Sequence, residues 1–118
     1  MRVFVYGTLR QGQANETFLS GASLLGPHRT APCFRMLDLG PYPGVVSGGT
    51  TAIHGEVYAI DGQVLALLDR LEDYPTSYDR QRIPTPWGPA FIYLYRRQVP
   101  KARLVPSGDW LDCPNASP

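Results

Sequence analysis

One acidic residue stands on the apolar side of an otherwise amphipathic segment. When residues 62–73 are drawn as a helix at about 100° per residue, the leucines form one arc, and Glu72 falls within it between Leu65 and Leu68. A buried, ionised carboxylate costs several kcal/mol, so such a group must be hydrogen-bonded, protonated or placed at a cavity. Burial and the negative end of a helix both raise a carboxyl pKa. Glu72 is therefore a candidate acid/base near neutral pH.

The same helical plot leaves a simpler alternative open. Glu72 could bend out to water or pair with Arg80, as acidic residues at helix ends often do. The plot also places Asp69 and Asp73 on the solvent side and Leu67 on the core side.

A second candidate lies at the start of the chain, where the apolar residues 3–6 run into Gly7-Thr8-Leu9-Arg10. The β-branched and aromatic residues predict a strand, and Gly7 permits backbone angles that a Cβ would resist. A sharp turn there would leave several backbone N–H groups pointing the same way, which makes a small site for a carboxylate or phosphate. An ordinary strand end is the alternative.

Two further places carry polar or aromatic groups. Tyr42 stands in the stiff loop 40–44, where packing over the core is favoured over contact with a ligand. His54 and Glu56 share one face of a predicted strand. No nucleophile or third ligand accompanies them, so a surface pair is favoured over a catalytic pair.

The elements that must position these residues follow from periodicity and turn signals. Asn15 is expected to cap a short helix that carries Phe18 and Leu19, and residues 40–44 are expected to lack regular structure. In chain order, the other predicted elements are a strand at 33–39, a strand at 52–60, a helix from Gly62 to about Asp73 capped by Asp61 and ended by Tyr74-Pro75, a hairpin of strands 78–83 and 90–96, and Trp110 laid over the core.

Length and composition limit the fold. The 118 residues suffice for one domain, expected over 1–112 with a frayed tail at 113–118, and the content of Gly 12 and Pro 12 predicts a turn-rich, mostly β structure. With 11 basic and 10 acidic residues, the chain has no net field to attract nucleic acid or an anionic membrane, and neither is expected as a partner. No signal or membrane-spanning pattern occurs, so a cytoplasmic protein with Cys33 and Cys113 as reduced thiols is expected.

Taken together, the motifs resemble the γ-glutamylcyclotransferase-like (AIG2-like) family over residues 2 to about 112, closest to its short bacterial members and the γ-glutamylamine cyclotransferases. The order and spacing of the motifs carry the resemblance, since none of them is rare alone. The matching motifs are Tyr6-Gly7-Thr8-Leu9-Arg10 with Gly12 and Asn15, Tyr42-Pro43-Gly44, Gly55-Glu56-Val57-Tyr58, and Leu68-Asp69 followed by Glu72, Pro75, Tyr78 and Arg80.

The resemblance implies an α+β fold, a small mixed β-barrel flanked by a few helices, with no metal or cofactor. It implies that a γ-glutamyl amide, either a γ-glutamylamine or a γ-glutamyl amino acid, is converted to 5-oxoproline and a free amine. The substrate would be bound by Tyr6, Gly7, Thr8 and Leu9, and Glu72 would be the acid/base. Tyr78 would support it through a hydrogen bond.

Two points stay open at this stage. The chain could be a non-catalytic module that binds a small carboxylate in the same pocket, although such a module has no need of an inward Glu72 beside its ligand. Arg10 could pair with an acidic side chain or stand at the rim of the pocket. The leaving amine and the oligomeric state are not encoded in any short motif.

Overall fold

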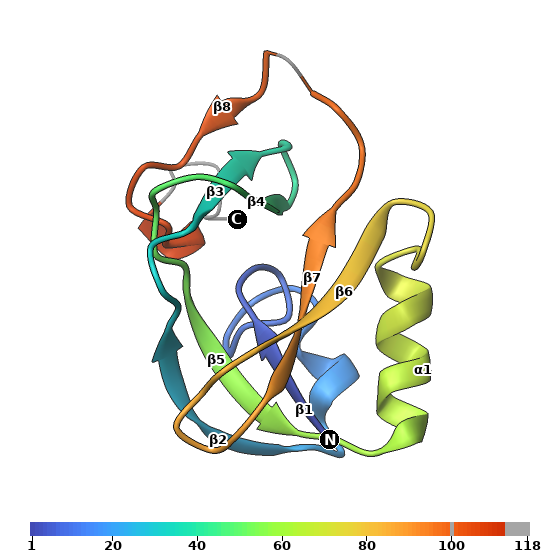
Figure 1. Cartoon of the computed structure of the whole chain (residues 1–118). Coiled ribbons are helices and arrows are strands. Elements are labelled where there is room, and N and C mark those ends of the chain that lie inside the picture. The colour runs from blue at the N-terminus through green and yellow to red at the C-terminus, as the bar shows by residue number, and fades with distance from the viewer. Residues whose placement is uncertain (100, 113–118) are drawn as a thin grey trace.

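A computed structural model describes residues 1–99 and 101–112, shown in Figure 1. The predicted tail 113–118, including Cys113, lies outside the described residues, whereas Cys33 is exposed. The elements in chain order are β1 (Arg2–Val5), the 3₁₀ helix η1 (Glu16–Leu19), β2 (Ser23–Arg29), β3 (Phe34–Asp38), β4 (Pro43–Ser47), β5 (His54–Ala59), α1 (Gly62–Leu71), β6 (Tyr78–Ile83), β7 (Ala90–Tyr95), β8 (Arg103–Leu104) and the 3₁₀ helix η2 (Trp110–Asp112).

Five strands form the main sheet in the order β2-β5-β1-β7-β6. Neighbouring strands run antiparallel except β1 and β7, which pair in parallel at Val3 and Phe91. The short first strand is therefore the middle strand of the sheet, and the turn that follows it emerges near the centre of the molecule. This position explains why the first strand is apolar on both faces: Val3, Phe4 and Val5 are all buried.

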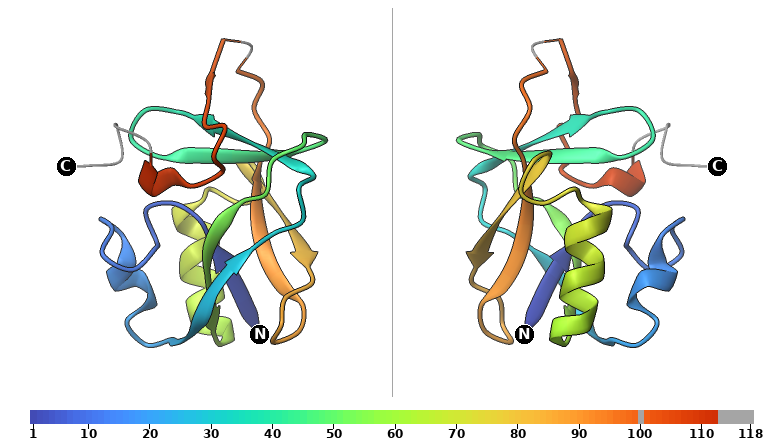
Figure 2. Two further views of the ribbon diagram at one scale, coloured as in Figure 1. Left: turned by 90° about the vertical axis from the view of Figure 1, so that its left-hand side faces the viewer. Right: turned by 90° about the vertical axis from the view of Figure 1, so that its right-hand side faces the viewer.

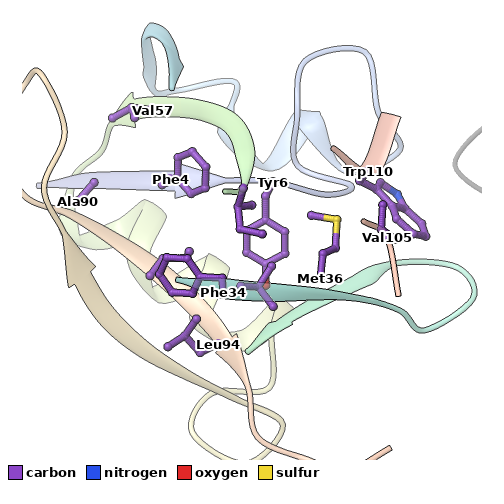
Figure 3. Close-up of a cluster of buried hydrophobic side chains, with 12 residues drawn as sticks. Phe4, Tyr6, Phe34, Met36, Val57, Ala90, Leu94, Val105 and Trp110 are labelled. Carbon is purple, nitrogen blue, oxygen red and sulfur yellow. The ribbon is translucent and has the colours of Figure 1, made fainter. Parts of the chain in front are cut away.

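A second sheet of three strands, in the order β4-β3-β8, lies across one end of the main sheet (Figures 1 and 2). Between the two sheets lies a core that contains Phe4, Phe34, Met36 and the fully buried Trp110, as Figure 3 shows. Trp110 therefore covers the core as the sequence predicts.

The other face of the main sheet packs against α1 and η1. Val3, Tyr58 and Tyr93 on the sheet contact Leu68 of α1 and Leu19 of η1 in a second apolar cluster. The helix begins where predicted, because the Asp61 side chain accepts a hydrogen bond from the N–H of Val64 at 2.9 Å.

The orientation of α1 differs from the helical plot by a small rotation. Leu67, expected in the core, is 43% exposed, whereas Asp69 is only partly exposed. The Asp69 carboxylate accepts a hydrogen bond from the Tyr93 hydroxyl at 2.7 Å and pairs with Arg80. These two partners on β6 and β7 satisfy an acidic group on the sheet side, so the buried arc shifts toward Asp69 and away from Leu67.

The expectation of an α+β fold is confirmed, but the sheets do not close into a barrel. Each outer strand of the main sheet has features that oppose further pairing. In β2 the register shifts between Leu24 and Gly26, and Pro27 lacks an N–H donor, while β6 carries Arg80 and Arg82. In the described part of the chain one α-helix, not several, flanks the sheets.

The hairpin of β6 and β7 is confirmed, with Tyr78 opposite Tyr95 and Ile83 opposite Ala90. Two other predictions are wrong. The loop expected at 40–44 gives way at Pro43 to strand β4, because a proline at the first position of a strand costs no ladder hydrogen bond. Asn15 does not cap η1 with its side chain, which bonds to Thr8 instead. None of the helices in residues 1–99 and 101–112 is long and apolar enough to cross a membrane.

Candidate active site

A cavity of about 420 Å³ opens between the turn after β1 and the C-terminal end of α1. Its volume suits a ligand the size of a dipeptide or smaller. The residues that line it come from five parts of the chain: Phe4 to Leu9, Ala14 and Asn15, Pro41 to Pro43, Leu71 to Asp73 with Ser77 and Tyr78, and Tyr93. Every candidate site residue named from the sequence, namely Tyr6, Gly7, Thr8, Leu9, Glu72 and Tyr78, is among them.

Glu72 is the residue that follows the last turn of α1, and its N–H donates to the Leu68 carbonyl at 2.9 Å. Its carboxyl group is partly buried, and within the described residues no hydrogen bond or ion pair to it is recorded. Burial raises the pKa of Glu72 from its ordinary value of 4.5 to about 7. The carboxyl is thus poised to gain or lose a proton near neutral pH.

Arg80 does not neutralise Glu72. Its Nε lies 3.1 Å from the Asp69 carboxylate, although the geometry is not that of an aligned hydrogen bond, and its guanidinium covers the rings of Tyr74 and Phe91. The alternative in which Glu72 pairs with Arg80 is therefore wrong. The guanidinium of Arg80 already interacts with the Asp69 carboxylate and with the faces of two aromatic rings.

The turn after β1 lines the cavity with residues whose backbone donors lack partners. Arg10 N–H closes the turn by donating to the Gly7 carbonyl at 3.0 Å. No acceptor within residues 1–99 and 101–112 is recorded for the N–H groups of Gly7, Thr8 or Leu9. Unpaired N–H groups on successive residues form the kind of concavity that binds an anion.

Gly7 is required for a different reason from the one the sequence suggested. Its φ does not lie in the left-handed region, unlike that of Gly12 at 84°. Instead, a Cβ at Gly7 would lie 2.8 Å from two ring carbons of Pro43. The glycine lets the turn and strand β4 approach each other across the base of the cavity.

Asn15 fixes the other side of this turn and was missed as a site residue. Its N–H donates to the Thr8 carbonyl at 2.8 Å, and its side-chain amide donates to the Thr8 hydroxyl at 2.9 Å. The two bonds hold Thr8 from both backbone and side chain. The spacing of seven residues gives no periodic signal, which explains why the sequence does not reveal the contact.

Two buried tyrosines lie on the Glu72 side of the cavity. The Tyr78 hydroxyl donates to the Pro43 carbonyl at 2.9 Å, and the Tyr6 hydroxyl donates to the Tyr93 carbonyl at 2.7 Å. Burial, and next the charge on Glu72, raise the pKa of Tyr78. The pKa of Tyr6 is raised by burial and then by Tyr78 and Glu72. These phenols therefore stay protonated and act through hydrogen bonds.

Tyr42 lines the cavity and is 43% exposed, so its expected place over the core is wrong. The stiff loop before β4 holds the ring at the opening, because Pro43 is fixed at the start of the strand.

Behind the turn lies an ionic cluster of Arg10, Glu56 and Asp109. Arg10 Nε is 2.6 Å from Glu56, and its Nη1 is 2.8 Å from Asp109. Glu56 is 8% exposed and also accepts the Gln11 N–H at 3.0 Å. The cluster ties the end of the turn to β5 and to the C-terminal segment, and it answers the open question about Arg10.

The surface pair expected for His54 and Glu56 is therefore wrong. Glu56 is buried because Arg10 and the Gln11 N–H satisfy its carboxylate, and neither His54 nor Glu56 lines the cavity. A metal site is not indicated either: over the described ranges, no three His, Cys, Asp or Glu side chains gather as metal ligands would.

Known proteins resemble this chain over almost its whole length. A family model described as γ-glutamyl cyclotransferase, AIG2-like, matches residues 3–112. A putative γ-glutamylcyclotransferase of Vibrio cholerae is 50% identical over 108 residues, covering 92% of this chain and 93% of its own. The Escherichia coli γ-glutamylcyclotransferase family protein YtfP is 47% identical over 112 residues, covering 95% and 97%.

Solved structures share the fold. The solution structure of Escherichia coli ytfP has a TM-score of 0.78 at 46% identity and covers 95% of this chain and 97% of its own. The crystal structure of an aig2-like protein from Mus musculus has a TM-score of 0.75 at 26% identity, covering 96% and 83%. On the match of almost the whole sequence, the chain belongs to the γ-glutamyl cyclotransferase, AIG2-like family.

Proposed function

We propose that this protein converts a γ-glutamyl amide into 5-oxoproline and a free amine, with Glu72 as the acid and base. One observation carries the proposal. The Glu72 carboxyl has no hydrogen-bond or ion-pair partner among the described residues, and burial raises its pKa to about 7; it lines one cavity with Gly7, Thr8 and Leu9, whose N–H groups also lack an acceptor there.

The glutamyl half of the substrate would be bound by its α-carboxylate at the N–H groups of Gly7, Thr8 and Leu9. No Arg or Lys is among the residues that line the cavity, so backbone dipoles must neutralise this carboxylate. Holding the carboxylate at the turn leaves the side chain free to fold back. The α-nitrogen and the γ-carbonyl carbon then meet within one molecule, which gives a large entropic advantage over a reaction between separate molecules.

The bond changes need proton transfer but no covalent intermediate with the protein. The α-nitrogen, initially an ammonium, loses a proton to Glu72 and attacks the γ-carbonyl, so that a C–N bond forms and a tetrahedral oxyanion develops. The old amide C–N bond then breaks as Glu72 returns its proton to the leaving nitrogen. The new lactam nitrogen then gives up its second proton and the released amine takes one up from water, so that overall the attacking nitrogen loses two protons and the leaving amine, released as an ammonium, gains two.

The raised pKa of Glu72 suits both halves of this cycle. In the empty cavity burial favours the neutral acid. A substrate ammonium beside the carboxyl favours its ionised form, so binding prepares the base. Once the ammonium has given up its proton, Glu72 is protonated and can act as the general acid that protonates the leaving nitrogen.

Tyr78 would orient the attacking nitrogen. Its O–H is committed to the Pro43 carbonyl, which leaves the lone pairs of the phenol oxygen free to accept a hydrogen bond from the substrate ammonium. Tyr6, whose O–H donates to the Tyr93 carbonyl, would form part of the floor of the cavity.

The test is to incubate the purified protein with a panel of γ-glutamyl amines and γ-glutamyl amino acids and to measure 5-oxoproline and the released amine in equal amounts. Formation of both products supports the proposal. If no member of the panel reacts but 5-oxoproline binds saturably, the protein is a non-catalytic carboxylate-binding module. An unpaired Glu72 argues against that module, because a site that only binds a small carboxylate has no need of a second carboxyl beside its ligand.

A further inference from the structure

The opening of the cavity has a different chemical character from its interior. Most lining residues are buried or half-buried, but four are exposed: Ala14, Pro41, Tyr42 and Asp73. Among these four, Asp73 alone carries a charge. A leaving group that extends away from the bound glutamyl half must pass these residues to reach solvent.

Asp73 adopts a backbone conformation that is unusual for its type. Its φ is 52°, and it lies just past the end of α1, at the position where helices most often place glycine or asparagine. A residue with a Cβ pays a conformational penalty of about 1 kcal/mol there. Such strain is often retained where a side chain has a functional role.

The Asp73 side chain is held by one partner and leaves one oxygen available. Its Oδ2 accepts a hydrogen bond from the Ser77 hydroxyl at 2.8 Å, and the described residues provide no recorded partner for Oδ1. The exposed Arg97 donates to the Ser77 oxygen at 3.2 Å but does not line the cavity. Ser77 therefore lies between the cation and the carboxylate.

We infer that Asp73 selects leaving amines that carry a second, positively charged group, so that diamine-type γ-glutamyl amides are the favoured substrates. This inference rests on the proposed function. Glu72 and Asp73 line the same cavity, and Asp73 is the exposed one of the two, so a leaving group whose nitrogen is protonated by Glu72 passes Asp73 on its way to solvent. The exposed ring of Tyr42 adds a face on which an alkylammonium can rest. A leaving group that ends in a carboxylate meets repulsion from Asp73, with no basic residue among the cavity lining to offset it.

The test uses three substrates with the same glutamyl half and leaving groups of similar length: 1,4-diaminobutane, n-pentylamine and 4-aminobutanoate. The kcat/KM for 5-oxoproline release should fall in that order, by roughly 5-fold at each step at low ionic strength, as expected for one partly exposed charge pair. In D73N, asparagine keeps the backbone preference and the acceptor for Ser77 but loses the charge. The ratio between the first two substrates should then fall to about 1–2. E16Q removes an equal charge outside this cavity and should leave the ratio unchanged.

The outcomes separate this inference from the proposed function. If none of the three substrates reacts in the wild type although a γ-glutamyl amino acid does, this inference fails and the proposed function stands; if no γ-glutamyl amide of any kind reacts, both fail. If all three react at equal rates, or if the ratio in D73N equals that of the wild type, Asp73 does not select the amine although the cyclisation stands. If E16Q lowers the kcat/KM ratio of the first two substrates as much as D73N does, that ratio reflects the overall charge of the protein, and the inference is also overturned. Should D73N not fold, the wild-type ratio must decrease as salt is raised, and a ratio independent of salt overturns the inference.

Discussion

Replacing Glu72 by glutamine should make the protein more stable at alkaline pH and leave its stability unchanged at acid pH. In the folded protein burial raises the pKa of this carboxyl from 4.5 to about 7, so ionising it opposes folding. Below pH 4.5 the carboxyl is protonated in both states and costs nothing. Between pH 4.5 and 7 the native state binds more protons than the unfolded state, and stability therefore falls as pH rises. Above pH 7 the full penalty is present.

The size of the effect follows from the same values. A tenfold change in proton affinity corresponds to about 1.4 kcal/mol, so the rise in pKa from 4.5 to about 7 corresponds to at most about 3.5 kcal/mol. Because Glu72 is partly exposed, water screens the charge, and about 1–2 kcal/mol is the realistic expectation. For a domain of this size, that gain raises the unfolding temperature by roughly 4–8 °C.

The assay is urea unfolding of wild type, Glu72→Gln and Glu16→Gln at pH 8.5 and again at pH 4. Glu16 is exposed and its carboxylate accepts the Gly12 N–H, so its variant controls for the loss of one carboxylate. The free energy of unfolding of Glu72→Gln should exceed that of wild type at pH 8.5 and equal it at pH 4. Equal stability at both pH values, or a loss at both, would refute the claim that the Glu72 carboxyl is desolvated.

Two further predictions follow from the cavity. The kcat/KM for 5-oxoproline formation should fall about tenfold per pH unit below about pH 7, because the free enzyme must hold Glu72 as a base; a profile flat down to pH 5 would contradict this role. Gly7→Ala should destabilise the fold by about 1–3 kcal/mol and weaken substrate binding, since its Cβ would overlap the Pro43 ring. Gly21→Ala has open space around it and serves as the control in both urea unfolding and activity, and equal behaviour of the two variants would exclude the steric argument.

Local pattern was sufficient to predict the elements that carry the site. The strand before Gly7, the capped helix that ends at Glu72 and the hairpin that begins at Tyr78 each rest on short-range periodicity and turn signals, and each occurs in the structure. Together with the inward position of Glu72 on the helical plot, these elements bring the named residues to one cavity.

What the sequence did not reveal depends on contacts between distant segments. The local pattern predicts Glu56 at the surface, because its partner Arg10 lies 46 positions away in the chain. The helical plot likewise predicts Asp69 on the solvent side, because its partners Tyr93 and Arg80 come from strands later in the chain. The strands β2, β4 and β8 are short or contain proline, so their pairing partners, more than their own residues, define them.

The most direct test of the central claim is the rate of 5-oxoproline release by Glu72→Gln and wild type at saturating substrate. Glutamine keeps the shape of the side chain but cannot move a proton, so we expect turnover to fall by at least 10²-fold. Binding of 5-oxoproline, measured by calorimetry, should persist in the variant and show that the cavity is intact. Turnover within a few fold of wild type would contradict the account, because the proton would then be transferred by another group.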